Sequence, residues 1–167
     1  MEPAHHVTRI LHDEHVAALG MLNQLAGLLT QTGHQTPPAV DAPGLSTTLT
    51  GMATAIDGEI TGHFAFEEEQ LFPRLAEVGD GDLGVFLSEE HEIILPIGQR
   101  LSQLARDAAE SGFSAEGWQE FHRLGGEFVE RLTGHIQKEE IGLTAALDAM
   151  LDDDTDGTLA MAYLAER

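Results

Sequence analysis

Hydrophobic residues recur at spacings of three and four positions in four long segments of the chain, which is the period of an amphipathic helix. These segments run from Leu11 to Leu29, from Leu49 to Leu75, from Leu87 to Ala105 and from Phe121 to Met150. Each is too long for a β-strand and keeps its apolar positions on one face of a helix. We therefore predict four amphipathic helices, each of which buries one stripe of side chains.

Breaks rich in glycine, proline and polar residues separate the four segments. Residues 33–45 contain three prolines and two glycines, and shorter breaks lie at residues 79–84 and at Ser111–Gly112. Ser46 and Ser114 are predicted to cap the helices that follow them, and Pro96 is predicted to kink the third helix. Because short connections favour antiparallel neighbours, the predicted fold is all-α, an up-down-up-down antiparallel four-helix bundle.

The end of the chain has a different pattern. An acidic run occupies Asp152–Asp156, and a weak helical pattern follows over Thr158–Glu166. With 167 residues, the chain has the length of one domain. We therefore assign residues 1–151 to the bundle and residues 152–167 to an acidic linker and a short C-terminal helix.

Each of the four apolar stripes is interrupted by a histidine, and two of these histidines are followed four positions later by a glutamate. The interrupting residues are His15, His63 with Glu67, His91, and His135 with Glu139. Residues four apart share a helix face, so each His-x-x-x-Glu pair can address one centre. The histidines of neighbouring helices lie at similar distances from the intervening breaks, which places the group at one level of the bundle.

A single histidine on an apolar stripe is usually a core residue with a satisfied hydrogen bond, but here six polar residues converge. Buried carboxylates require cations, and the chain has only 8 Lys and Arg residues, none of them on the stripes. Bound metal is the simplest solution. Imidazole and carboxylate without sulfur suit iron, manganese or zinc, and two carboxylates among four imidazoles suit a dinuclear centre with Glu67 and Glu139 bridging. The Glu-x-x-His spacing of ferritin-like bundles is absent from the core positions.

Composition excludes several other classes of function. The formal net charge of −21 argues against nucleic acid and anionic membranes as main partners. The absence of cysteine excludes disulfides, thiolate metal sites and a cysteine nucleophile. No apolar run approaches the ~20 residues that span a bilayer, and no secretory signal pattern is present. The expected compartment is the cytoplasm.

The same residues resemble a known family, the hemerythrin-like (HHE cation-binding) proteins, over residues 5–150. The stretch HDEHVAALGMLNQL at residues 12–25 is similar to the first-helix motif of that family. The stretch HFAFEEEQLFPRL at residues 63–75 is similar to its specific HFxxEExxLFP motif. Glu90–His91 and His135–Glu139 match the third and fourth helices.

The resemblance implies a non-haem di-iron centre with an oxo or hydroxo bridge inside a four-helix bundle. The implied ligands are His15, His63, Glu67, His91, His135 and Glu139. Oxygen-carrying members have a second histidine four positions after the third-helix ligand, where this chain has Leu95. Their fourth-helix motif also ends in an aspartate after four intervening residues, whereas here a glutamate follows after three. Both departures resemble bacterial and sensor-type members.

The expected function is binding of dioxygen or a related small oxidant, such as peroxide or nitric oxide, with no partner protein identified. Two alternatives stay open: an enzyme that processes peroxide, in a peroxidase-like or catalase-like way, or nitric oxide, and an iron or oxygen sensor or iron-storage protein. His12 is equally suited to coordinate a metal or to orient a ligand. Glu59 is a less favoured extra ligand, and Glu68 a residue that can orient one.

The remaining polar residues are expected to have no part in the site. They are expected to be solvated, to point elsewhere or to lie apart from it: His5, His6, His34, His122, Glu69, Glu90, Glu140 and Tyr163.

Overall fold

The computed structural model describes residues 3–166, and nearly all of these residues are helical. Two helices of the bundle are single elements, α1 (His6–Thr32) and α5 (Gly81–Ser111). The other two are continuous helices interrupted by π-helical turns, and α8 (Asp153–Ala165) follows the bundle. The second long helix consists of α2 (Leu45–Asp57), η1 (Gly58–His63), α3 (Phe64–Phe66), η2 (Glu67–Leu71) and α4 (Phe72–Glu77), and the fourth of α6 (Ala115–Lys138), η3 (Glu139–Leu143) and α7 (Thr144–Met150).

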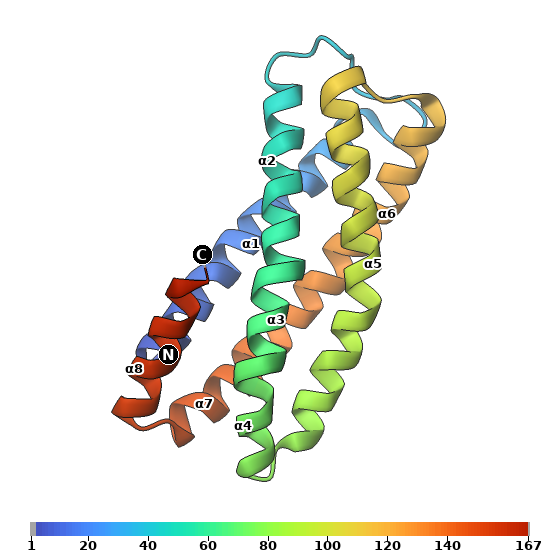
Figure 1. Cartoon of the computed structure of the whole chain (residues 1–167). Coiled ribbons are helices and arrows are strands. Elements are labelled where there is room, and N and C mark those ends of the chain that lie inside the picture. The colour runs from blue at the N-terminus through green and yellow to red at the C-terminus, as the bar shows by residue number, and fades with distance from the viewer. Residues whose placement is uncertain (1–2, 167) are drawn as a thin grey trace.

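The four long helices form an antiparallel bundle, which confirms the predicted fold class (Figure 1). The helix from α2 to α4 lies alongside α5, while α1 lies alongside α6 and is tilted relative to the first pair (Figure 1). The connection from α1 to α2 crosses the end of the bundle that is farthest from α8. Within residues 3–166 there is no β-strand.

The C-terminal helix packs against α1 and starts earlier than predicted. The prediction placed a linker at Asp152–Asp156, but only Asp152 lies outside the helix, and its side chain accepts a hydrogen bond from the Thr155 N–H at 2.7 Å. Aspartates at the start of a helix satisfy free N–H groups and stabilise the positive end of the helix dipole. The acidic run is therefore the beginning of α8.

The helix boundaries correct two further predictions. Ser114 caps α6 as expected, since its side chain accepts a hydrogen bond from the Gly117 N–H. Ser46 is not a cap, because α2 begins at Leu45 after a left-handed Gly44 (φ 76°). The Ser46 hydroxyl instead donates to the Ala109 carbonyl at 2.9 Å and so joins α2 to α5.

The break between the second and third helices is shorter than predicted. It was expected to extend over residues 79–84, but α5 already begins at Gly81. Gly84 is a helical residue that lies against Phe72, where an added Cβ would approach the Phe72 Cβ to 3.2 Å. Helix α5 continues through Pro96 without interruption, and the kink expected there stays a prediction.

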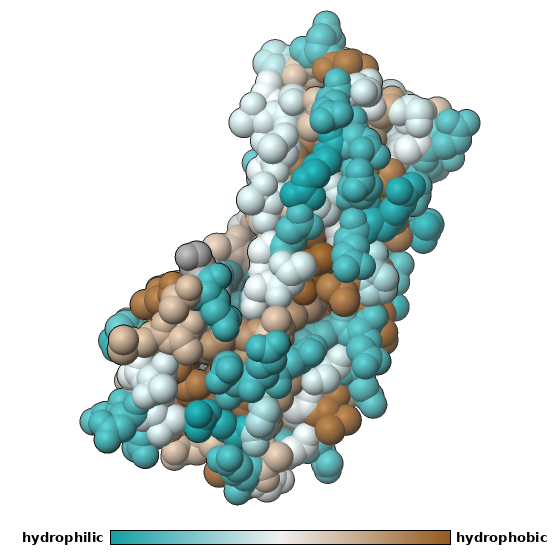
Figure 2. Space-filling model, viewed as in Figure 1, coloured by the Kyte–Doolittle hydropathy of each residue, from teal (hydrophilic) through white to brown (hydrophobic). Residues whose placement is uncertain are grey.

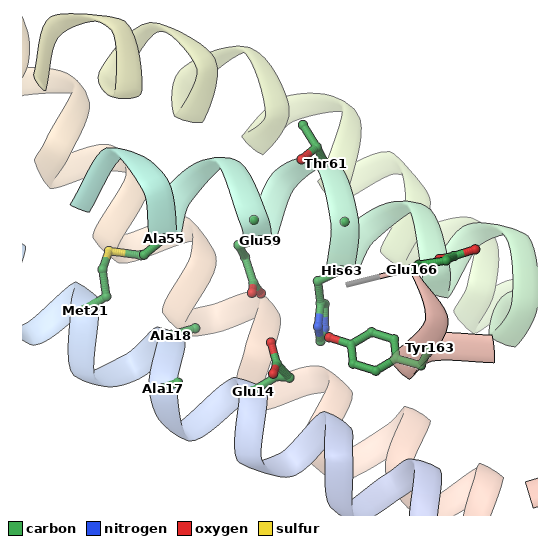
Figure 3. A pocket seen from close by; sticks show the side chains of 12 residues that line it. Glu14, Ala17, Ala18, Met21, Ala55, Glu59, Thr61, His63, Tyr163 and Glu166 are labelled. Carbon is green, nitrogen blue, oxygen red and sulfur yellow. The ribbon is translucent and has the colours of Figure 1, made fainter. Parts of the chain in front are cut away.

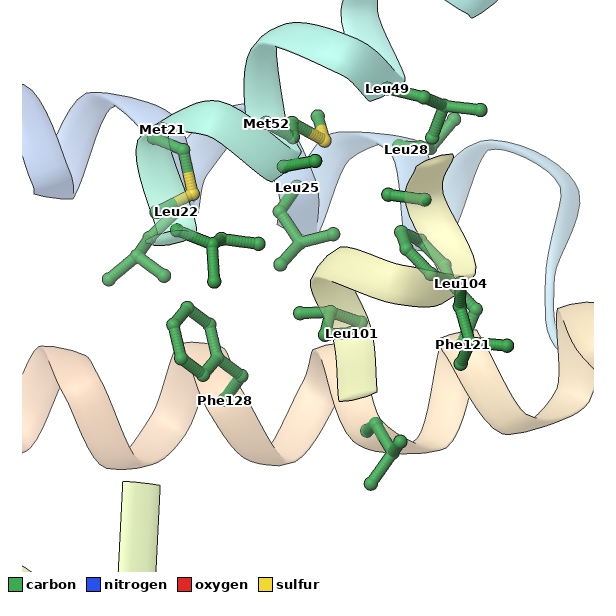
Figure 4. Packing of buried hydrophobic residues seen from close by; sticks show 14 of the residues in the cluster. Met21, Leu22, Leu25, Leu28, Leu49, Met52, Leu101, Leu104, Phe121 and Phe128 are labelled. Carbon is green, nitrogen blue, oxygen red and sulfur yellow. The ribbon is translucent and has the colours of Figure 1, made fainter. Parts of the chain in front are cut away.

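The interior contains two apolar clusters with a polar layer between them. The larger cluster fills the end of the bundle near the α1–α2 connection, and Figure 4 shows its interdigitated leucine, methionine and phenylalanine side chains. The smaller cluster joins the start of α1 to α4, α7 and α8. Along α1 the smaller cluster ends at Leu11 and the larger begins at Ala18, so His15 lies between them.

The face of the molecule shown in Figure 2 has more hydrophilic than hydrophobic residues. The hydrophobic residues on this face lie in separate places. In the part of the chain that the structure describes, each helix is too short or too polar to cross a membrane.

Candidate metal centre

The six residues predicted from the apolar stripes meet in the polar layer. His15 comes from α1, His91 from α5 and His135 from α6. His63 is the last residue of a π-helical turn, and Glu67 and Glu139 are each the first residue of one. Each of the six is buried, with at most 2% of its surface exposed: His15, His63, Glu67, His91, His135 and Glu139.

These residues divide into two overlapping groups that share both carboxylates. One group is His15, His63, Glu67 and Glu139, and the other is Glu67, His91, His135 and Glu139. In each group the potential ligand atoms all lie within 4.8 Å of one another. This arrangement suits two metal ions that lie side by side. Each ion would have two imidazoles of its own, and both carboxylates would be shared by the two ions.

The individual contacts show that each carboxylate faces both groups. Glu139 Oε2 lies 3.0 Å from His15 Nε2, while its Oε1 lies 2.7 Å from His135 Nε2. Glu67 Oε1 lies 3.0 Å from His63 Nε2, and its Oε2 lies 3.4 Å from His91 Nε2. A carboxylate with one oxygen on each side is disposed to bridge two cations.

Several buried polar atoms in this layer make no well-oriented hydrogen bond, although most of them lie within 3.4 Å of an oppositely charged group. They are His15 Nε2, both ring nitrogens of His63, and all four carboxylate oxygens of Glu67 and Glu139. Buried polar atoms of this kind cost free energy unless something satisfies them. His91 Nε2 and His135 Nε2 are also only 2.9 Å apart. Nitrogen lone pairs that converge in this way repel each other unless a proton or a cation lies between them, so the residues present fit a bound metal.

A ring of outer carboxylates orients three of the four histidines. The Nδ1–H groups donate to a carboxylate in each case, from His15 to Glu140 at 2.6 Å and from His91 to Glu68 at 2.7 Å. His135 donates to Glu90 at 2.9 Å. This bond fixes the tautomer and turns the Nε2 lone pair toward the centre. The orienting role foreseen for Glu68 is observed, whereas the expectation that Glu90 and Glu140 point elsewhere is wrong.

The π-helical turns coincide with the site. Turn η1 ends at His63, η2 begins at Glu67 and η3 begins at Glu139. In each turn a backbone N–H bonds five residues back, for example Thr144 to Glu139. Such wider turns are rare and are frequently found at functional sites. Sequence periodicity alone contains no signal for them.

Without metal, the layer is held by charge pairs. Burial alone would raise the pKa of the Glu139 carboxyl, but His135, His15 and His91 hold it well below its usual range. Burial opposes the charged form of His15, yet the Glu139 carboxylate outweighs it and raises the pKa of His15 to about 9. In the same way, Glu139 and Glu67 raise the pKa of His91 to about 10. The raised histidine pKa values favour protonated imidazoles beside Glu67 and Glu139 in the metal-free protein, where the geometry also suits metal cations.

His12 and the other histidines lie outside both groups. His12 Nδ1 lies 2.9 Å from Glu140 Oε2, so of its two predicted roles this contact favours orientation of a ligand through Glu140. His122 Nε2 lies 2.9 Å from the Leu29 carbonyl oxygen, and its ring contacts His34. Leu95, which stands in place of a second histidine, packs against the larger apolar cluster.

Sequence reasoning missed the surroundings of His63. Tyr163 was not expected near the site, but α8 brings it into a pocket that His63 and Glu59 also line (Figure 3). Glu59 is 6% exposed, and its Oε1 has no hydrogen bond. The position of Glu59 four residues before His63 was the only sequence signal that it lies near the site. The sequence had no signal for the packing of α8, which brings Tyr163 there.

Comparison with known proteins agrees with this geometry. The family model described as "Hemerythrin HHE cation binding domain" matches residues 6–147. That range contains all six residues of the two groups. The chain matches no curated protein and no solved structure.

Proposed function

Because the chain belongs to the hemerythrin HHE cation-binding domain family, we propose that it is a non-haem di-iron protein that binds dioxygen or a related small oxidant. Iron is chosen over zinc because reaction with a small oxidant needs a redox-active metal, and Zn²⁺ has no redox chemistry. The six proposed ligands are His15, His63, Glu67, His91, His135 and Glu139.

The observation that carries this proposal is the sharing of Glu67 and Glu139 by both groups. A single metal ion would need only one of the two groups. With two ions, each buried carboxylate faces a cation on both sides, and its negative charge is compensated by metal and not by lysine or arginine. The shared carboxylates therefore support a dinuclear centre over a mononuclear one.

Bound iron would supply the electrons for reaction with a small oxidant. The residues of the chain hold the site in a fixed arrangement, because Glu68, Glu90 and Glu140 anchor three imidazoles from outside. The apolar clusters lie on both sides of the layer and limit its contact with water. The small buried space and the surrounding carboxylates favour a small neutral ligand over a large or anionic substrate.

A second candidate function, turnover of peroxide or nitric oxide, is favoured by Leu95. Each group offers two imidazoles and two shared carboxylates, and Leu95 adds no donor because it packs into the apolar core. Octahedral iron takes six ligands, so both metal positions are left with places for exogenous molecules. A pair that is accessible on both sides is better suited to convert a ligand than to release it unchanged.

The two candidates differ in their response to air. We expect the reduced, iron-loaded protein to oxidise irreversibly in air, because both metal positions can react. The measurement is the optical spectrum of an anaerobic sample, recorded before air, after air and after evacuation. The zinc-loaded protein is the control and should not change. A spectrum that returns to its starting form under vacuum would support reversible oxygen carriage and contradict the turnover candidate.

A further inference from the structure

A pocket of about 430 Å³ lies against one side of the metal centre, between α1, η1 and α8. His63 lines it and also belongs to one of the two ligand groups. Figure 3 shows the side chains of Glu14, Glu59, His63 and Tyr163 converging in it from these three elements. The rest of the lining is mainly small, with alanines and glycines on α1, α2 and η1, so the space between the helices stays open.

The charge of this pocket suits a cation. Among the residues that the structure describes, the lining contains three glutamates, Glu14, Glu59 and Glu166, and neither lysine nor arginine. A space lined by one sign of charge concentrates ions of the opposite sign. The volume also fits a hydrated ion, because six waters at about 30 Å³ each occupy roughly 200 Å³.

Glu59 is the feature that turns this acidic pocket into a binding site. It is buried, its Oε1 has no hydrogen bond, and it reaches toward α1 beside His63 (Figure 3). Burial raises the pKa of the Glu59 carboxyl, so the group is held at a cost that a cation would remove. Glu59 therefore lines the pocket as a buried carboxylate beside a histidine of the centre, one helical turn away in the sequence.

His63 differs from the other three histidines of the centre in a related way. Its Nδ1 has no hydrogen bond, whereas those of His15, His91 and His135 are each anchored by an outer carboxylate. An imidazole without this anchor can rotate about its side-chain bonds more easily than one held from outside. The histidine whose Nδ1 has no outer carboxylate is therefore the one that lines the acidic pocket.

We propose that this pocket is the loading site of the metal centre: a hydrated divalent cation first binds there, and Glu59 transfers it to the position beside His63. The inference rests on the proposed metal centre but concerns a separate step, the rate at which the centre fills. Glu14 attracts the cation, and Glu59 replaces part of its water shell. Neither glutamate belongs to the two ligand groups, so the loaded centre does not need them.

The test is the rate of cobalt(II) uptake by the metal-free protein, followed anaerobically by visible absorption after rapid mixing, with the bound metal measured at equilibrium. We expect Glu59→Gln to slow uptake by about tenfold or more and to leave the final metal content unchanged. Glu14→Gln should slow uptake to a smaller extent. Glu110→Gln removes the same charge from an exposed position near the end of α5 and should load at the wild-type rate.

Each outcome separates the loading step from the metal centre itself. Wild-type rates in both pocket variants would overturn the inference, and so would a Glu59→Gln protein that loses bound metal at equilibrium, because Glu59 would then be a ligand. If Glu59→Gln does not fold, as judged by circular dichroism, Glu14→Gln decides: slowed uptake supports the loading site and unchanged uptake overturns it. A wild-type protein that takes up no cobalt would contradict the proposed function as a whole.

Discussion

Glu139→Ala is expected to abolish binding of both metal ions. Glu139 contacts His15 with one carboxylate oxygen and His135 with the other, and it belongs to both ligand groups. Its removal takes a negative charge and a ligand from each metal position at once. Loss of a residue that only orients a ligand costs about 10–100-fold in metal affinity, so loss of this shared ligand should cost more than about 100-fold.

The measurement is metal content by elemental analysis after dialysis against excess iron. Glu130→Ala is the matched control, because it removes an exposed glutamate from the same long helix. His63→Ala should also lose metal, whereas His122→Ala should not, since His122 lies apart from both groups. A Glu139→Ala protein that keeps two metals would show that the carboxylate does not bridge, and loss of metal in His122→Ala would contradict the placement of the histidines.

Removal of the metal is expected to lower the thermal midpoint by about 10 °C at neutral pH. The metal-free layer keeps buried carboxylate oxygens and ring nitrogens that are held only by charge pairs and make no well-oriented hydrogen bond. Metal binding satisfies these atoms only in the folded chain and therefore contributes folding free energy. Calorimetry of the loaded and the chelated protein provides the comparison.

The pH dependence of the two forms should have opposite signs. The pKa of His15 is raised to about 9 and that of His91 to about 10, from an ordinary value of 6.5. Protonation of these groups therefore stabilises the metal-free fold fully below pH 6.5, and the contribution is lost as the pH rises through 9 to 10. In the loaded protein, protons compete with the metal for the same nitrogens, so stability falls as the pH falls. Equal midpoints for both forms from pH 7 to pH 10 would contradict a buried metal centre.

The fold and the six central residues could be predicted because one periodicity controls both. His15 lies on the same buried helix stripe as Leu11 and Ala18, so its imidazole has to point into the interior. The same constraint acts on the other three long helices. Four stripes in a bundle have to meet, so their polar interruptions meet as well.

The features that were missed depend on tertiary packing or on local departures from α-helical geometry. The carboxylates of Glu90 and Glu140 lie at positions beside the stripes, and only the packed bundle shows that they reach His135 and His15. The π-helical turns at His63, Glu67 and Glu139 coincide with the centre. Helix propensity and hydrophobic periodicity do not distinguish them from α-helix. The position of Tyr163 depends on α8 folding back along α1.

The most direct test of the account is the metal stoichiometry of the purified, iron-reconstituted chain, measured by elemental analysis together with protein concentration. Two ligand groups that share both carboxylates predict about two iron ions per chain. The loss of both ions in Glu139→Ala would follow from the same arrangement. A single iron at full occupancy, or one zinc that iron does not displace, would contradict the dinuclear centre.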